Sequence, residues 1–334
     1  MVGVSEAGAA AGEIRRRRAR RRLLISLTLA ALLLAVGVGV GVVTGGSFRA
    51  AAPVQHTCRP PSKQAVRALD GVRTWEYHHK SLSDGTVIRA RAARWQGVDP
   101  YALDIGGGSA LCLAGGRVQG SWPADTSWKT MHGTAGVIVD GAPHATIEDL
   151  RVDGYGDAVR IVDDSPNFLL RRVHMSYSRD DCVENDWLNS GTVQDSLLDG
   201  CYNAFSARTY HGQSHVTDDG SSHLWTIENT LVRLQPMPQV YKDRGRVPGT
   251  AGFFKWDKDG PRLSLVNDVF RADQPADTVG LGIPAGKLSN CKNNVMVWLG
   301  RGPYPAPLPS CFSVTTDEAV WSRAVARWKQ DHNQ

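Results

Sequence analysis

The sequence predicts an all-β fold, a right-handed single-stranded parallel β-helix, because two short patterns recur in step along the chain. In the first pattern, an apolar residue is followed two places later by Asp, Arg or Asn and then by an apolar pair. A period of about two dozen residues, carried by short β-type runs without a helical pattern, is typical of stacked repeats. The pattern begins at six places: Ile147, Leu169, Val193, Ile227, Leu265 and Cys291.

A second run recurs between these phrases and sets the register of the coils. Its alignment places one residue of each run at the same position on successive coils: Thr134, Asp157, Asp181, Asn203, Thr250 and Asp277. Alternate side chains of a strand point to opposite faces, so Val159, Val183 and Phe205 are expected in the interior. The outward positions are then those of Arg160, Glu184, Ser206, Val162, Asp186, Arg208 and Lys255.

The coils are expected to occupy residues 63–315, followed by a C-terminal helix and tail at residues 316–334. Thr316 is expected to cap this helix, and apolar residues between Val320 and Trp328 recur at helical spacing. A stack of coils leaves an open apolar end, so we expect the helix to cover that end. Two insertions, at residues 209–222 and 235–248, predict loops beside the most acidic coils.

The N-terminal region predicts a membrane anchor. Residues 1–22 form a basic tail, and residues 23–43 are an uncharged apolar run of 21 residues, long enough to cross a bilayer as a helix. Arginines on the N-terminal side predict a single pass with the N-terminus in the cytoplasm and the remainder outside. A cleaved signal peptide ending at residues 50–52 is the alternative. Residues 44–62 are interpreted as a stalk.

The formal net charge of +5 comes from the first 22 residues, which hold seven Arg and two Glu. The rest of the chain has no net charge, which argues against a nucleic-acid partner. Six cysteines in an exported chain predict up to three disulfides. The coil register pairs Cys182 with Cys201. Closeness in the sequence pairs Cys291 with Cys311, which leaves Cys58 with Cys112.

A cluster of carboxylates is the candidate catalytic site. Residues of equal phase on adjacent coils lie about 4.8 Å apart, so Asp157 is expected beside Asp181, with Asp180 next to it. Carboxylates this close raise at least one pKa, as a general acid requires. Acids, aromatics and cations around these three are the expected substrate-binding residues: Glu184, Asp186, Tyr202, Asn203, Arg208, Lys255 and Trp256. Such a surface suits a polysaccharide, whose hydrolysis with inversion needs two carboxyls about 6.5–9.5 Å apart.

Asp157 and the run from Asp180 to Val183 resemble the polygalacturonase family, glycoside hydrolase family 28, within the right-handed parallel β-helix (pectate lyase-like) superfamily. That family carries one Asp on a coil, Gly-Asp-Asp-Cys on the next, then a His and later an Arg-x-Lys pair. The resemblance implies that Asp181 is the general acid and that Asp157 and Asp180 activate water. Tyr202-Asn203 stands where the family has its His, and no Arg-x-Lys pair is in phase.

Three alternatives remain open at this point. The aspartates are also consistent with a structural ladder at β-helix turns, and the groove with a non-catalytic cell-surface module that binds envelope glycans. A polysaccharide lyase or epimerase is the third, with Arg208 as the base and calcium held by Asp157, Asp180 and Asp181. A hydrolase of this kind is expected to need no cofactor, and no cysteine or histidine spacing indicates structural zinc.

Overall fold

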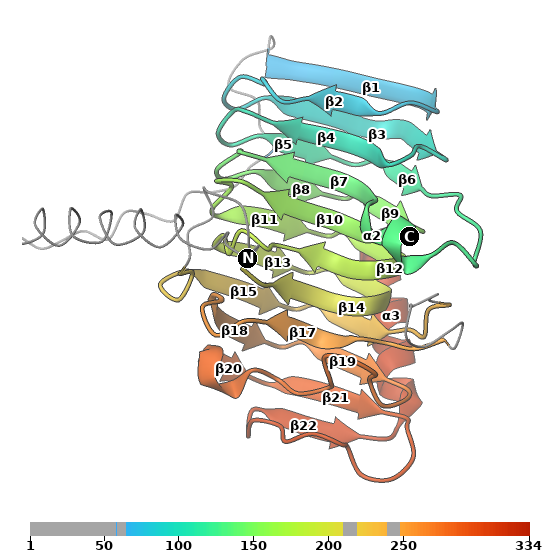
Figure 1. The fold of residues 1–334 in the computed structure, drawn as a ribbon, viewed down its shortest axis with the longest axis vertical. Helices are drawn as coiled ribbons and strands as arrows, with labels where there is room; N and C mark the ends of the chain where they lie inside the picture. The colour runs from blue at the N-terminus through green and yellow to red at the C-terminus, as the bar shows by residue number, and fades with distance from the viewer. Residues whose placement is uncertain (1–57, 59–64, 210–218, 239–247) are drawn as a thin grey trace, which may run out of the picture. The chain divides into compact units, whose positions relative to one another are not determined.

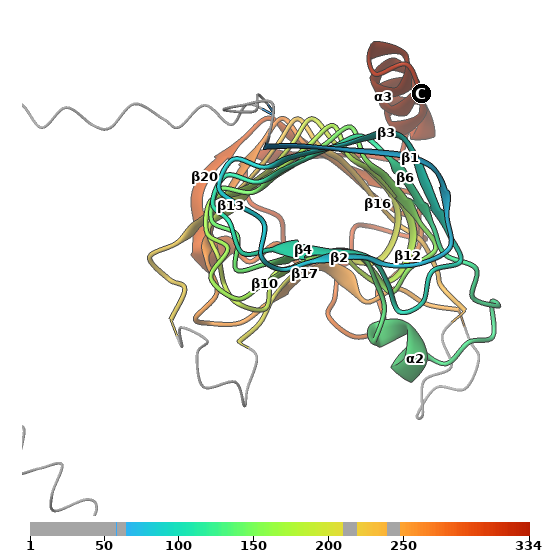
Figure 2. The same cartoon turned by 90° about the horizontal axis from the view of Figure 1, so that it is seen from above.

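The computed structural model describes Cys58 and residues 65–209, 219–238 and 248–334. These residues form a solenoid in which every pairing between named strands is parallel (Figure 1). Viewed along the stack, successive coils lie one above another around the interior (Figure 2). The predicted all-β parallel solenoid is therefore confirmed.

The expected basic tail, transmembrane helix and most of the stalk lie outside the described residues, as does most of each insertion. The helices that the structure describes are all too short or too polar to span a bilayer.

Each full coil contributes strands to three faces. Face A consists of β2 (Tyr77–His79), β4 (Tyr101–Gly106), β7 (Ala135–Asp140), β10 (Asp157–Val162), the ends of β12 (His174–Glu184) and β14 (Leu197–Ala207), and β17 (Gly252–Trp256). Face B consists of the starts of β1 (Val66–Arg73) and β3 (Val87–Gln96), then β5 (Cys112–Ala114), β8 (Thr146–Glu148), β11 (Phe168–Arg171), β13 (Gly191–Gln194), β15 (Leu224–Glu228), β18 (Arg262–Val266) and β20 (Leu288–Lys292).

Face C takes the ends of β1 and β3 and the starts of β12 and β14. Its other strands are β6 (Arg117–Gln119), β9 (Arg151–Asp153), β16 (Leu231–Leu234), β19 (Val269–Ala272), β21 (Asn294–Trp298) and β22 (Phe312–Thr315). Two α-helices, α2 (Trp128–His132) and α3 (Glu318–Asp331), and a 3₁₀ turn, η2 (Ala285–Lys287), complete the described elements.

The interior of face A is a column of apolar side chains in register across the coils. It runs through Tyr77, Leu103, Val137, Val159, Val183, Phe205 and Phe254, all of which belong to the main core. β-Branched and aromatic residues suit these positions because they pack well on a pleated surface. The inward orientation predicted for Val159, Val183 and Phe205 is confirmed.

The polar column is confirmed only in its middle. Asp181 is in register with Asn203, and the Asp181 amide donates to Asp157 Oδ1 at 3.0 Å. The ends of the predicted column are wrong. Ala135 opposes Asp157, so Thr134 is one residue out of phase.

After the insertions the predicted register is wrong by two residues on the first coil and by three on the next. Gly252, not Thr250, opposes Asn203, and Gly280, not Asp277, bridges Gly252. Lys255 therefore lies beside Ser206, in the column of Glu184, and not in the column of Asp186. The inserted loops hide the phase, because the repeat length changes across them. The second phrase also begins one residue later than expected, since Leu170 opposes Ile147.

The turn between faces B and C explains the Asp, Arg or Asn of the repeated phrase. On six coils this residue has left-handed backbone geometry, with φ between 46° and 59°: Asp149, Arg172, Asp195, Asn229, Asn267 and Asn293. Asn and Asp adopt this conformation more readily than other non-glycine residues. Amide groups also form a ladder here, since Asn293 donates to Asn267 and Asn267 to Asn229, each at 3.2 Å.

Helix α3 confirms the predicted C-terminal helix, but its position differs from the expected one. Its cap is Asp317, whose side chain accepts from the Ala319 amide, and not Thr316. Trp321 and Trp328 pack against Leu197 and Leu231 on face C, so the helix covers the side of the stack and not its open end (Figures 1 and 2). The physical reason is an outward apolar column on face C that needs cover: Leu197, Leu231, Val269 and Val295.

Three disulfides join the described cysteines in the pairs expected from the sequence. They are Cys58–Cys112, Cys182–Cys201 and Cys291–Cys311. The first ties the segment before β1 to β5, and the last ties β20 to the approach of β22.

Candidate functional site

An irregularity in face A brings carboxylates from neighbouring coils together. Two consecutive residues point into the core on each strand, Ala158 with Val159 and Cys182 with Val183. The residues that flank such a pair then lie on the same outer side, three positions apart. The carboxylate oxygens of Asp157, Asp181 and Glu184 accordingly lie within 4.8 Å of one another.

Two cations from the same face neutralise this cluster. Arg160 Nε lies 2.9 Å from both Asp157 Oδ2 and Glu184 Oε1. Lys255 Nζ lies 2.6 Å from Asp181 Oδ2 and 4.0 Å from Asp180 Oδ1. The other oxygen of Asp181 accepts from Asn203 Nδ2 at 2.6 Å. The two-residue shift in register at β17 is what allows Lys255 to reach Asp181.

His132 is a site residue that the sequence reasoning missed. Its Nδ1 lies 2.7 Å from Asp180 Oδ2, and its ring stacks on Trp128 with centroids 4.6 Å apart. The side chain is 49% exposed, whereas Asp180 is buried. His132 ends a five-residue helix outside the repeat, so the coil alignment does not include it. The available signal was its position directly before the Gly133 run.

The site contains one more acid than it has cations. Four carboxyls, those of Asp157, Asp180, Asp181 and Glu184, face Arg160, Lys255 and His132. At least one proton is therefore expected to remain among the carboxyls even when all three basic groups are charged, because like charges this close do not all ionise.

The surroundings of each carboxyl decide which of the four hold a proton. Burial raises the pKa of Asp157, raises that of Asp181 to about 8 against the pull of Lys255, and raises that of Glu184 well above its usual range. Asp180 differs: burial acts upward on its pKa, but Lys255 and the hydrogen bond from His132 hold it below the usual value. The hydrogen bond to Asp180 in turn raises the pKa of His132.

A groove of about 490 Å³ runs over face A beside the cluster. Of the four clustered carboxyls, Glu184 alone lines it, together with His132, Arg160, Asp186 and Trp187. Asp157 and Asp181 have no exposed surface, and Asp180 is 2% exposed. The three expected catalytic aspartates are therefore brought together, but they lie beneath the groove wall.

The other expected substrate-binding residues are divided. Asp186 lines the groove, where its Oδ1 accepts from Ser206 Oγ at 2.7 Å and from the Arg208 amide at 3.1 Å. Tyr202 is 2% exposed and packs in a small apolar cluster with Met237. Trp256 packs on Trp225, with ring centroids 5.1 Å apart. Neither Tyr202 nor Trp256 lines the groove. Both lie away from it because their positions belong to the packed interior and its margins.

The carboxylates of Asp157, Asp181 and Glu184 form a group that could hold a metal ion. This group differs from the calcium site expected from the sequence, because Asp180 is bonded to His132 instead. Arg160 and Lys255 lie against the same oxygens, so a metal ion would have to compete with both cations.

No protein-family model, curated protein or solved structure matches the chain.

Proposed function

We propose that the protein hydrolyses glycosidic bonds of a polysaccharide bound in the face A groove, with Glu184 as general acid and Asp186 as general base. The observation that carries the proposal is the environment of Glu184. Its carboxyl has a raised pKa, it borders a group of acids that share a proton, and it opens on the groove. Pairs of carboxyls in contrasting environments are typical of acid and base roles.

This assignment changes the one implied by the family resemblance. Asp181 is sealed from the groove and bonded to Lys255 and Asn203, so it acts through its neighbours and not on substrate. Glu184 donates the proton to the leaving oxygen, while Arg160 fixes its carboxyl. Asp186 lines the groove, and hydrogen bonds from Ser206 and from the Arg208 amide hold its carboxyl where it can activate water. Trp187 offers an aromatic surface to a sugar ring.

The test is to incubate the full chain with neutral and acidic polysaccharides and to measure new reducing ends. Glu184→Gln is expected to lower the rate by about 10²-fold or more while substrate is still retained, since general acid catalysis contributes at least that much. The matched control, Glu228→Gln, removes a carboxyl on face B and is expected to leave the rate unchanged. An unchanged rate in Glu184→Gln would contradict the assignment.

A second candidate is glycan binding without cleavage. It is favoured by the close contacts of Asp157 with Arg160 and of Asp181 with Lys255, which suit a rigid wall as well as a reactive one. If the protein only binds glycans, wild type and Glu184→Gln should be retained equally on a polysaccharide, and neither should release products. New ultraviolet absorbance that depends on calcium would instead indicate a lyase.

We also propose that the coil is right-handed and that the domain lies outside the cytoplasm on a single-pass anchor. Crossover connections between parallel strands are right-handed in almost all cases. Three disulfides support an oxidising compartment. A cell-envelope glycan is the partner that fits this location, and no nucleic-acid partner is proposed.

A further inference from the structure

Face C carries a column of arginines that the face A site does not use. Arg94 is in register with Arg117, and Arg117 with Arg151, on three successive coils. Neighbouring strands lie about 4.8 Å apart. Like charges directly opposite one another destabilise a sheet. Such a column therefore needs a reason other than stability.

These three arginines line a groove of about 700 Å³, and residues 331–334 at the end of α3 line it as well. Arg117 and Arg151 also line an adjoining hollow of about 500 Å³ with His174 and Lys329. Contacts of the last turn hold this wall in place, since His332 Nε2 lies 3.0 Å from Asp195 Oδ1 and Gln334 Oε1 lies 2.9 Å from His174 Nδ1. The hollowed surface thus extends along the stack and across the strands.

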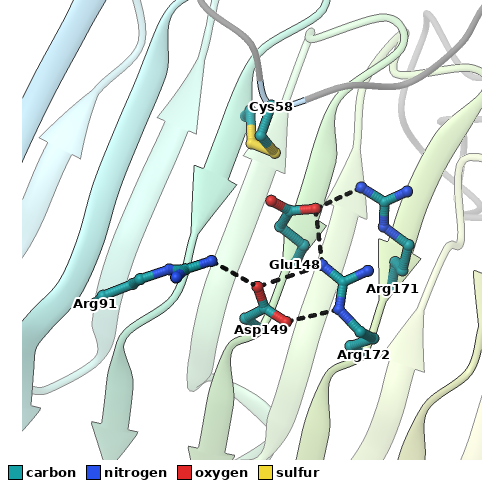
Figure 3. Close-up of a disulfide and its surroundings, with 7 residues drawn as sticks. Cys58, Arg91, Glu148, Asp149, Arg171 and Arg172 are labelled. Carbon is teal, nitrogen blue, oxygen red and sulfur yellow. Dashed lines mark hydrogen bonds and ion pairs between the residues drawn. A yellow bond between two sulfur atoms is a disulfide. The ribbon is translucent and has the colours of Figure 1, made fainter. Parts of the chain in front are cut away.

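The charges of the groove are only partly compensated. Arg91 and Arg172, at its edge, are paired with Asp149, and Arg172 also reaches Glu148 (Figure 3). Glu148 is shared with Arg171 (Figure 3). In the described part of the chain, Arg94, Arg117 and Arg151 have no such carboxylate partner. Burial, followed by the charge of Arg117, lowers the pKa of Arg151, which is the effect expected of a cation without a counterion.

We propose that the column of Arg94, Arg117 and Arg151 binds a linear acidic polysaccharide through the carboxylates that recur along the polymer. A guanidinium presents a planar fork that matches a carboxylate, and a repeated fork at strand spacing suits a repeated anion. The site lies on face C and Glu184 on face A, so the proposal stands whether or not the face A groove cleaves glycans. Its role is to hold the protein on a charged polymer.

Two other polyanions fit less well. The arginines lie in a hollow walled by residues 331–334, whereas lipid headgroups form a flat surface. Single-stranded nucleic acids are bound on aromatic platforms, and among the described residues no Phe, Tyr or Trp lines this groove. A flexible polymer with anionic groups along one edge enters such a groove most easily.

The experiment measures binding of the full chain to alginate, a linear polyuronate, against dextran, anionic lipid vesicles and a single-stranded oligonucleotide. Wild type is expected to bind alginate and not dextran, more weakly as salt rises. The double variant Arg117→Gln/Arg151→Gln should weaken alginate binding by about tenfold or more, because hydrogen bonds to charged groups are lost. Its thermal midpoint should be equal or higher, since repulsion is removed.

Two controls separate this site from other effects. Arg301→Gln removes an exposed arginine elsewhere and should bind as wild type does. Glu184→Gln should also retain alginate binding at the arginine column, because Glu184 lies on face A. Failure of the hydrolase proposal can therefore be distinguished from failure of this one. Unchanged alginate binding in the double variant would overturn the proposal. The proposal would also be overturned if wild type bound vesicles or the oligonucleotide but not alginate, and if the double variant lost that binding.

Discussion

Replacing Lys255 with Met is expected to destabilise the protein by an amount that increases with pH. Lys255 Nζ lies 2.6 Å from Asp181 Oδ2, and the Lys255 side chain is 14% exposed. Burial raises the pKa of Asp181 to about 8, so below that value its carboxyl is largely protonated in the folded protein. The variant then loses little more than one hydrogen bond, about 1–2 kcal/mol of unfolding free energy.

Above about pH 8 the two proteins diverge. The charge of Lys255 lowers the pKa of Asp181, so the folded variant keeps a proton that folded wild type releases. The unfolded chain has already lost this proton near its ordinary pKa of about 3.9. The stability of the variant therefore continues to fall where that of wild type levels off. The difference should grow by about 1.4 kcal/mol per pH unit, towards the roughly 3–5 kcal/mol that breaking a buried ion pair costs.

The assay is urea unfolding of the full chain at about pH 6 and at about pH 9, monitored by tryptophan fluorescence. The stabilities of variant and wild type are compared through their unfolding midpoints, provided that the slope with urea concentration is the same. Lys258→Met is the matched control, because that side chain is 90% exposed, and it should change stability by less than about 0.5 kcal/mol. Adding Asp181→Asn to Lys255→Met should reduce the pH dependence to the part that Asp180 contributes, because Lys255 also lowers the pKa of that carboxyl. Equal destabilisation at both pH values would show that the Asp181 carboxyl does not hold a proton below about pH 8.

Two further changes test the packing of α3 and the histidine of the site. Trp328→Ala removes a side chain that is 5% exposed and packs on face C, so it should lower the free energy of unfolding in urea by about 3–5 kcal/mol. The control, Arg327→Ala, removes an exposed side chain and should lower it little. A loss below about 1 kcal/mol in Trp328→Ala would contradict this packing. The raised pKa of His132 stabilises the fold below its ordinary value of about 6.5, and this stabilisation is lost as pH rises through the folded value. His132→Gln should accordingly destabilise the protein more at about pH 5.5 than at about pH 8.5. The difference between the two pH values should be less than about 1 kcal/mol, because the ring is half-exposed. An equal effect at both pH values would refute the pairing of His132 with Asp180.

The sequence was sufficient for the architecture wherever the repeat is uninterrupted. Strand alternation and spacing placed Val159 and Val183 in the core, and they placed Asp157 beside Asp181. Where loops of unequal length intervene, phase cannot be counted through them, and Lys255 was consequently assigned to the wrong column.

The site was predicted less well than the fold, for two physical reasons. Glu184 was predicted to bind substrate, but its closeness to Asp157 and Asp181 was not predicted, because strict alternation does not predict two consecutive inward residues. His132 comes from a short helix outside the repeat, and only three-dimensional packing brings it to Asp180. The arginine column was missed because two of the strands that carry it, β6 and β9, are only three residues long and too short to show a pattern.

The placement of the disulfides has a consequence for how the stack fails. A solenoid is held by contacts between neighbouring coils, so it ordinarily peels open from an outermost turn inward. Here Cys58–Cys112 locks the β1–β3–β5 layers, and Cys291–Cys311 locks the β20–β22 layers. Fraying at either extremity is thereby suppressed. Digestion by a protease should begin at the loops between locked layers, and a reducing agent should redirect the first cuts to the outermost turns.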